Sequence, residues 1–132
     1  MPDRIVHVCL NVPDAAAAVD WYTANFDLEE VESWRWSWER DGVHVENRYV
    51  ADEAGMMIQL RDAEGQTSFE RGEAWDHLGI LVDDVEVAVQ RIDHHGVVLE
   101  PQYNPNSGAH IAFVEDPYGH VIELLCPDED GT

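Results

Sequence analysis

The sequence has 132 residues, 45% of them hydrophobic, which suits one folded domain and excludes a chain that is disordered by composition. Acidic side chains outnumber arginine and lysine by 28 to 7, all seven being arginine, and the formal net charge is −21. Nucleic acids and anionic membranes are therefore poor partners. Because concentrated salt screens such self-repulsion, we predict a protein of a high-salt cytoplasm, with an ordinary acidic cytosolic protein as the alternative.

Two further features narrow the class of protein. No apolar run is long enough to span a bilayer, and the first residues lack the pattern of a signal peptide, so we expect a soluble cytoplasmic protein. Cys9 and Cys126 do not have the spacing of a cysteine metal site or a disulfide framework. We expect them to be free and mostly buried thiols.

The first half of the chain predicts a strand, a helix and three more strands. Alternating residues predict the first strand at 5–12, and Asp14 is a suitable N-cap for the helix. We expect this helix to bury Ala18, Trp21, Tyr22 and Phe26. The strands that follow are "VESWRWSW", "VHVENRYV" and one around "MIQL" (57–60). Trp34, Trp36 and Trp38 are expected on one strand face, either as a packed or dimer surface or as an aromatic substrate wall.

The second half repeats the first. "HLGILVDDVEVAVQRI" aligns with "HVCLNVPDAAAAVDWY" at an offset of 70, and "VIEL" (121–124) aligns with "MIQL" at an offset of 64. Asp83 or Asp84 is the expected N-cap of a helix that ends at Gly96. Strands "VVLEPQ" and "HIAFVE", a "DPYG" turn and a last strand follow. We predict an α+β protein with two βαβββ repeats, about 4–62 and 74–127, in a single domain over 1–132.

Four strands that begin or end a repeat have one wholly apolar face and one face with a polar side chain. The polar side chains are His7, Gln59, His77 and Glu123. We expect the apolar faces to lie under the helices. Glu123 interrupts an apolar run, where a carboxylate should be exposed, paired or bound to a cation. Two imidazoles, an amide oxygen and a carboxylate suit Zn, Ni, Co, Mn or Fe, so we predict that all four residues bind one divalent metal ion.

Three segments carry a family resemblance: "IVHVCLNVPDAAAAVDWYTANFDLE", "WDHLGILVDDVEVAVQRI" and "IAFVEDPYGHVIELL". They resemble the vicinal oxygen chelate superfamily and, within it, glyoxalase I (lactoylglutathione lyase), over nearly the whole chain and least at 33–55. The resemblance implies paired βαβββ modules that form a half-open β-barrel around a metal ion, with the same four residues at the ligand positions. It also implies a homodimer with shared active sites.

The resemblance further implies the reaction, which is the conversion of a hemithioacetal of methylglyoxal and a small thiol to a lactoyl thioester. A metal ion would stabilise the developing negative charge, and Glu123 would be both ligand and base. Because Gln59 is not a carboxylate, a one-base route is expected. Asn11 stands where the resemblance implies an arginine, so the thiol is either glutathione or another small thiol. Arg61 and Arg48 are the basic candidates for binding it.

Two other activities use similar residue sets. A methylmalonyl-CoA epimerase resembles this pattern and adds a second glutamate as acid or base, for which Glu46 is the candidate. Glu46 is therefore kept beside Glu123 as a candidate catalytic residue, with an exposed strand position as its alternative. An iron-dependent dioxygenase needs only two histidines and one carboxylate, here His7, His77 and Glu123.

Overall fold

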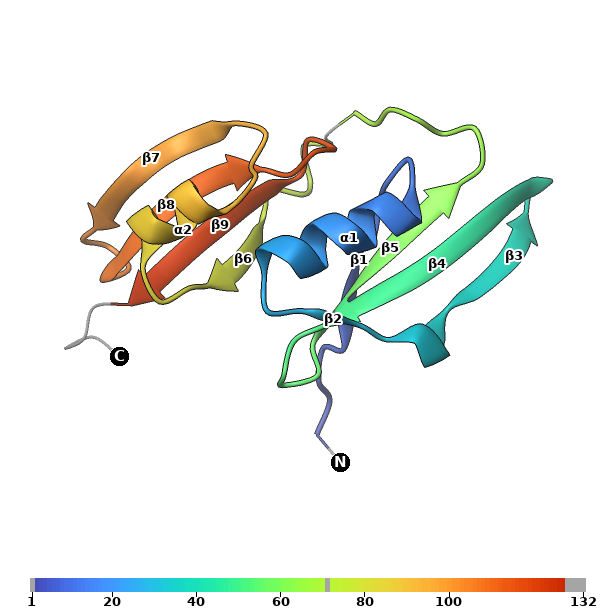
Figure 1. Cartoon of the computed structure of the whole chain (residues 1–132), viewed down its shortest axis with the longest axis horizontal. Coiled ribbons are helices and arrows are strands. Elements are labelled where there is room, and N and C mark those ends of the chain that lie inside the picture. The colour runs from blue at the N-terminus through green and yellow to red at the C-terminus, as the bar shows by residue number, and fades with distance from the viewer. Residues whose placement is uncertain (1, 71, 128–132) are drawn as a thin grey trace. The chain divides into compact units, whose positions relative to one another are not determined.

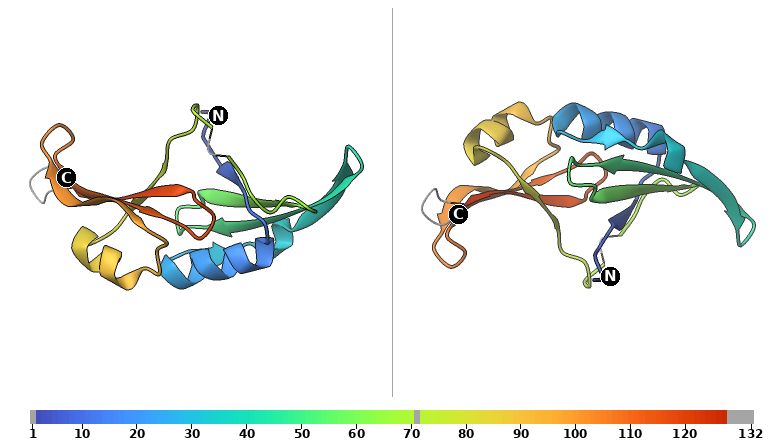
Figure 2. Two further views of the ribbon diagram at one scale, coloured as in Figure 1. Left: turned by 90° about the horizontal axis from the view of Figure 1, so that it is seen from above. Right: turned by 90° about the horizontal axis from the view of Figure 1, so that it is seen from below.

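The chain divides into two compact units, residues 1–69 and 70–132, and the computed structural model describes residues 2–70 and 72–127. Within the described residues each unit contains one α-helix and one mixed sheet (Figure 1). Figure 2 shows each helix along one face of its own sheet. The α+β class is confirmed, and both units are of the βαβββ type, with one additional two-residue strand after the helix of the first unit. That the two units form a single domain remains a prediction.

The elements of the first unit are β1 (His7–Asn11), α1 (Ala15–Asn25), β2 (Glu29–Glu30), the 3₁₀ helix η1 (Glu32–Trp34), β3 (Trp36–Arg40), β4 (Val43–Ala51) and β5 (Met57–Ala63). The strand order is β1-β5-β4-β2, and β3 also pairs with β4. The β1–β5 pair is parallel and the other pairs are antiparallel. The first and last strands of the repeat are therefore neighbours.

The elements of the second unit are β6 (Leu78–Leu81), α2 (Val85–Arg91), β7 (Val97–Asn104), β8 (Ala109–Glu115) and β9 (Val121–Pro127). The strand order is β6-β9-β8-β7, again with a parallel pair between the first and last strands. No helix among residues 2–70 and 72–127 is both long and apolar enough to cross a membrane.

Both α-helices begin at the aspartates that the sequence indicates. The Asp14 carboxylate accepts a hydrogen bond from Ala17 N at 3.0 Å, and the Asp84 carboxylate accepts one from Val87 N at 3.0 Å. Each aspartate has the extended backbone of an N-cap, with φ −151°. The predicted buried face of α1 is also confirmed, because Ala18, Trp21, Tyr22 and Phe26 are at most 8% exposed.

One bond identifies the sheet face on which α1 lies. Ala15 N, at the start of the helix, donates to Asp62 Oδ2 in β5 at 2.9 Å. Side chains alternate along a strand, so Leu60 lies on the helix side with Asp62, and Gln59 lies on the opposite side. The fully buried Leu60 agrees with this assignment. The face of β5 opposite the helix therefore carries the predicted metal ligand.

Three expectations about local structure are wrong. Helix α2 ends at Arg91 rather than at Gly96, because the backbone before Gly96 already pairs with β8: His95 N donates to Glu115 O at 2.9 Å. Trp34 lies in the 3₁₀ helix, so only Trp36 and Trp38 share a face of β3. The two cysteines are free, as expected, but Cys9 is exposed and Cys126 is half-buried.

Candidate metal centre

In the second unit the structure brings His77 and Glu123 together. Strand β6 runs parallel to β9 with Gly79 opposite Glu123, and His77 lies two residues before Gly79 on the same face. His77 Nε2 is 3.2 Å from Glu123 Oε1, and the two side chains are 32% and 21% exposed. The glutamate inside the apolar run is therefore partly shielded and paired with an imidazole.

The hydrogen bond on the far side of the His77 ring orients this pair. His77 Nδ1 lies 2.7 Å from Asp76 Oδ1, so an Nδ1–H donates to a carboxylate. With the proton on Nδ1, the Nε2 lone pair faces the Glu123 oxygen, an arrangement that needs a proton or a cation between the two atoms. A histidine that donates its other N–H to a carboxylate is a common arrangement at metal sites.

The separation of the two atoms fits a shared ion. Two donor atoms that are each about 2.1 Å from one ion lie about 3.0 Å apart at a right angle and about 3.4 Å apart at the tetrahedral angle. The observed 3.2 Å between His77 Nε2 and Glu123 Oε1 lies between these values. The donor types and their spacing are therefore compatible with adjacent ligands of one divalent ion.

The first unit has an equivalent strand register. Strand β1 runs parallel to β5 with Cys9 opposite Gln59, and His7 lies two residues before Cys9 on the same face. The His7 ring packs edge-on against Tyr49, with ring centroids 5.8 Å apart, and Tyr49 is opposite Gln59.

The second unit repeats the aromatic contact as well. Phe113 is opposite Glu123, and its ring centroid is 5.0 Å from that of His77. Each unit therefore presents a histidine, an aromatic ring and a polar ligand candidate on neighbouring strands. The sequence offset of 64 residues relates Tyr49 to Phe113 as it relates Gln59 to Glu123.

Asn47 is a residue of this site that sequence analysis missed. Gln59 Nε2 donates to Asn47 Oδ1 at 2.7 Å, and Asn47 is only 1% exposed. No described residue forms a hydrogen bond with Gln59 Oε1. The alternation of Val45, Asn47 and Tyr49 in β4 is the sequence signal that could have indicated a polar residue on the same face as Gln59.

The structure does not bring Glu46 to this face. Glu46 is opposite Asp62, so it lies on the helix side of the sheet. Its side chain is 57% exposed, and it is 3.5 Å from His44 Nε2. Among the described residues, no three histidine, cysteine or acidic side chains gather as a metal cluster. His7 and Gln59 belong to one unit, and His77 and Glu123 to the other, so the four-ligand set remains a prediction.

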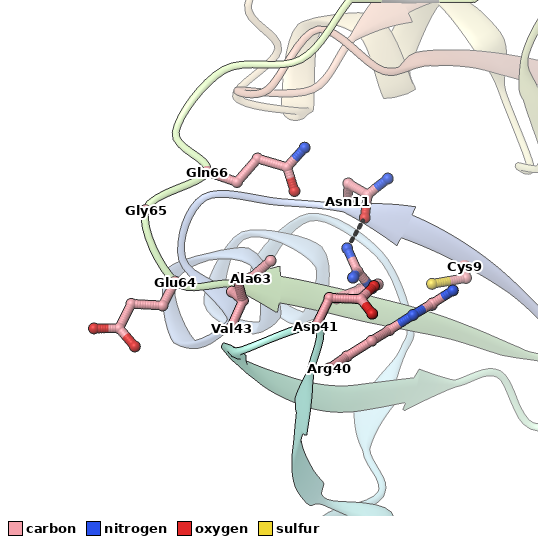
Figure 3. Close-up of a pocket in the computed structure, with 10 residues that line it drawn as sticks. Cys9, Asn11, Arg40, Asp41, Val43, Ala63, Glu64, Gly65 and Gln66 are labelled. Atoms are coloured by element: carbon pink, nitrogen blue, oxygen red, sulfur yellow. Dashed lines mark hydrogen bonds between the residues drawn. The ribbon is translucent and has the colours of Figure 1, made fainter.

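An open pocket of about 890 Å³ lies in the first unit (Figure 3). Cys9, opposite Gln59, is part of its wall. The other lining residues are Asn11, Arg40, Asp41, Val43, Arg61, Ala63, Glu64, Gly65 and Gln66. The pocket therefore contains two of the seven arginines of this acidic chain.

The two basic candidates of the sequence lie in different places. Arg61 Nη1 donates to Asn11 Oδ1 at 3.0 Å in the pocket. Arg48 instead forms an ion pair with Glu30 at 2.7 Å. Because Arg48 is opposite Leu60, it lies on the helix side of the sheet. Arg61 is therefore the candidate that lines the pocket.

The Cys9 thiol is disfavoured as a thiolate. The pKa of Cys9 is raised because neighbouring atoms displace water from its sulfur, although the residue as a whole is exposed. The positive charge of Arg61 lowers the pKa and partly opposes this effect. A thiol with a raised pKa is protonated at neutral pH, and only the thiolate is a good metal ligand or nucleophile. Cys9 is therefore a weak nucleophile at neutral pH.

Comparison with known proteins identifies the family. Residues 4–124 match the Glyoxalase/Bleomycin resistance protein/Dioxygenase superfamily. The chain belongs to this superfamily. Its two βαβββ sheets are those of the glyoxalase fold, and it is a glyoxalase I-like enzyme.

Three relatives illustrate the similarity. The chain is 31% identical to a probable lactoylglutathione lyase of Vibrio cholerae serotype O1, over 92% of this chain and 89% of that protein. It is 30% identical to lactoylglutathione lyase of Escherichia coli O157:H7, over 92% and 91%. The trypanothione-dependent glyoxalase I of Leishmania major is 26% identical, with a TM-score of 0.71 over 95% of this chain and 87% of that structure.

Proposed function

We propose that the protein is a metal-dependent glyoxalase that converts the hemithioacetal of a 2-oxoaldehyde and a small thiol to a 2-hydroxyacyl thioester. In this proposal His7, Gln59, His77 and Glu123 bind one divalent ion, either within one chain or across a homodimer. The observation that carries it is the strand register that both units share. In each unit, the parallel pair of first and last strands presents one histidine nitrogen donor and one side chain with an oxygen donor on the same face.

Glu123 is the proposed base. A divalent ion at the site would supply positive charge that stabilises the anion formed when the carbon-bound proton of the substrate leaves. Glu123 would accept that proton and return it to the neighbouring carbon, so that the substrate is isomerised without gain or loss of atoms. Gln59 is an amide and cannot accept the proton, which leaves one carboxylate among the four proposed ligands.

The pocket beside Gln59 supports an anionic thiol. Arg61 and Arg40 line it, together with the carboxylates of Asp41 and Glu64. A carboxylate on the thiol would be attracted to these two guanidinium groups. A neutral thiol would lack this attraction.

Metal content and turnover test the proposal. The purified protein should contain a transition metal, and after its removal Ni, Co, Zn, Mn or Fe should restore thioester formation from methylglyoxal and a thiol. We expect a carboxylate-bearing thiol such as glutathione to be used better than 2-mercaptoethanol, measured in potassium chloride. Absence of turnover with every metal and thiol would contradict the proposed reaction.

Glu123→Gln tests the role of the base. The substitution keeps an oxygen donor but removes the proton acceptor, so we expect kcat to fall by about 100-fold or more. Glu100→Gln is a matched control, because Glu100 is an exposed carboxylate on β7 of the same unit. Its kcat should be unchanged. A Glu123→Gln enzyme with normal kcat would remove Glu123 from the mechanism.

The two alternative activities, epimerase and dioxygenase, require different residues or reactants. The epimerase alternative needs a second carboxylate near the site, and Glu46 is on the opposite face of the sheet from Gln59. The dioxygenase alternative requires oxygen consumption. Exchange of the substrate α-hydrogen with solvent, without consumption of O₂, would favour the glyoxalase over the dioxygenase.

A further inference from the structure

The two units differ in the chemistry of the ligand candidate on the last strand. Glu123 has two equivalent carboxylate oxygens, either of which can bind a cation. Gln59 has one oxygen and one nitrogen, and only the oxygen is an acceptor. If Gln59 is a ligand, its amide must therefore be held with the oxygen end toward the ion, whereas Glu123 needs no such control.

Asn47 supplies an acceptor for the nitrogen end. Its Oδ1 accepts the hydrogen bond from Gln59 Nε2 at 2.7 Å, and the 1% exposure of Asn47 keeps water from replacing this bond. The amide of Gln59 is thereby oriented with Oε1 as the end that remains for a ligand. With Asn47 Oδ1 toward Gln59, the opposite orientation of the Gln59 amide would place two carbonyl oxygens against each other.

The second unit offers an internal comparison. The offset of 64 that relates Gln59 to Glu123 relates Asn47 to Ile111. Asn47 is opposite Arg61 in β5, two residues after Gln59, and Ile111 is opposite Leu125 in β9, two residues after Glu123. A polar residue therefore occurs at this strand position in the unit whose ligand candidate is an amide, and an apolar residue in the unit whose ligand candidate is a carboxylate.

Folding stability does not explain an asparagine at this position. Asn47 Nδ2 is buried and has no hydrogen-bond partner among the described residues. A buried N–H without a partner lowers the free energy of unfolding, and an apolar side chain of similar shape would avoid that penalty.

We infer that Asn47 is a positioning residue that holds the Gln59 amide with its oxygen toward the metal ion. The inference rests on the proposed metal centre, because it assigns a role only if Gln59 is a ligand. Asn47 does not touch the ion; it selects the end of Gln59 that does.

Metal titration of the 132-residue protein tests this role. After metal removal, the affinities for Co²⁺, Ni²⁺ and Zn²⁺ alone are measured by competition with a chromophoric chelator, and the visible spectrum of bound Co²⁺ reports the ligand set. Asn47→Leu should weaken binding by about 10- to 100-fold, as expected for loss of a residue that orients a ligand. Its melting temperature should stay close to that of the wild type, because the substitution removes the unpaired Asn47 Nδ2 but also leaves Gln59 Nε2 without its acceptor. Asn47→Asp keeps the acceptor and should bind at least as tightly as the wild type.

A second substitution distinguishes loss of the Gln59 amide orientation from a general disturbance of the metal site. In Gln59→Glu the ligand has two equivalent oxygens, so Asn47→Leu in that background should change the affinity by less than about twofold. Equal losses in both backgrounds would overturn the positioning role. So would an Asn47→Asp protein as weak as Asn47→Leu.

A matched control variant is available, and the failure of the metal centre can be distinguished from the failure of the positioning role. Asn25 is also a buried asparagine, whose Nδ2 donates to Trp21 O in α1 at 2.8 Å. Asn25→Leu should leave metal affinity unchanged. A wild-type protein that binds none of the three ions would overturn the metal centre itself. Wild-type binding that Asn47→Leu does not weaken would overturn the positioning role alone.

Discussion

Two arginines hold the Glu30 carboxylate in its charged form. Arg48 and Arg35 each donate two hydrogen bonds to its oxygens, at 2.7 and 2.8 Å. These bonds, first that of Arg48 and then that of Arg35, lower the pKa of Glu30 to about 2. Glu30 is on β2 and Arg48 is on β4, so the charged cluster fastens a two-residue strand to the sheet.

The stability contributed by Glu30 should depend on pH. Its pKa is lower in the folded state than in the unfolded state, so the contribution is fully present above the unfolded value of about 4.5 and is lost as pH falls through about 2. Glu30→Gln should lower the free energy of unfolding by about 1–2 kcal/mol at pH 7. The difference from the wild type should shrink as pH falls from 4.5 toward 2.

Urea unfolding of both proteins at a series of pH values measures this difference. Glu32→Gln is the control, because the Glu32 side chain is 75% exposed and contacts Arg35 at 3.2 Å. Exposed ion pairs contribute about 0.2–1 kcal/mol, so its effect should be smaller than that of Glu30→Gln. A Glu30→Gln effect of the same size at pH 2.5 and pH 7 would contradict the assignment.

At the scale of elements, the turn before the last strand is repeated in both units. Asp116 Oδ1 accepts from His120 N at 2.8 Å, and Asp52 Oδ1 accepts from Met56 N at 2.9 Å. In each turn the backbone of the aspartate also pairs with that of the residue four positions later. The residue before that partner is a glycine with φ near +90°, a conformation that favours glycine. The predicted "DPYG" turn thus has a counterpart at 52–56, sixty-four residues earlier.

Because Asp116 is buried and Asp52 is exposed, Asp116 should contribute more to the free energy of unfolding than Asp52. Asp116 is 1% exposed and also accepts from Tyr118 N at 2.9 Å, whereas Asp52 is exposed. Asp116→Ala leaves backbone N–H groups unsatisfied where water cannot easily replace the carboxylate, and should cost about 1–3 kcal/mol of unfolding free energy. Asp52→Ala should cost about 0.5 kcal/mol. Chemical denaturation measures both, and Asp116→Asn, which keeps the acceptor, should be milder than Asp116→Ala. Equal losses for the two alanine variants would exclude burial as the cause.

At the scale of the whole molecule, the net charge of −21 should make stability depend on salt. The screening length falls from about 10 Å at 0.1 M salt to about 3 Å at 1 M, so repulsion among the acidic side chains weakens. We expect the free energy of unfolding to rise by about 1 kcal/mol or more between 0.1 M and 1 M potassium chloride, which is about 4 °C in Tm. Thermal unfolding across this range measures it, and a flat or falling Tm would contradict a protein adapted to high salt.

Local chemistry made much of the fold and part of the site predictable. The alternation of residues identified the strands and assigned His7, Gln59, His77 and Glu123 to polar faces, because side chains of a strand point alternately to its two sides. The helix start at Asp14 was predictable, and that of the second helix was narrowed to Asp83 or Asp84, because a capping bond joins residues only three positions apart.

Pairing between strands that are distant in sequence decided the features of the fold and the site that the sequence did not predict. The end of α2 follows from the pairing of His95 with Glu115 in β8, which no property of the helix sequence specifies. The sequence could place Glu46 on one face of a strand, but only the register with β5 put it on the opposite side from Gln59 and put Asn47 within 2.7 Å of the Gln59 amide. Alternation is a property of one strand, whereas register is a relation between two strands and is set by the packing of the whole sheet.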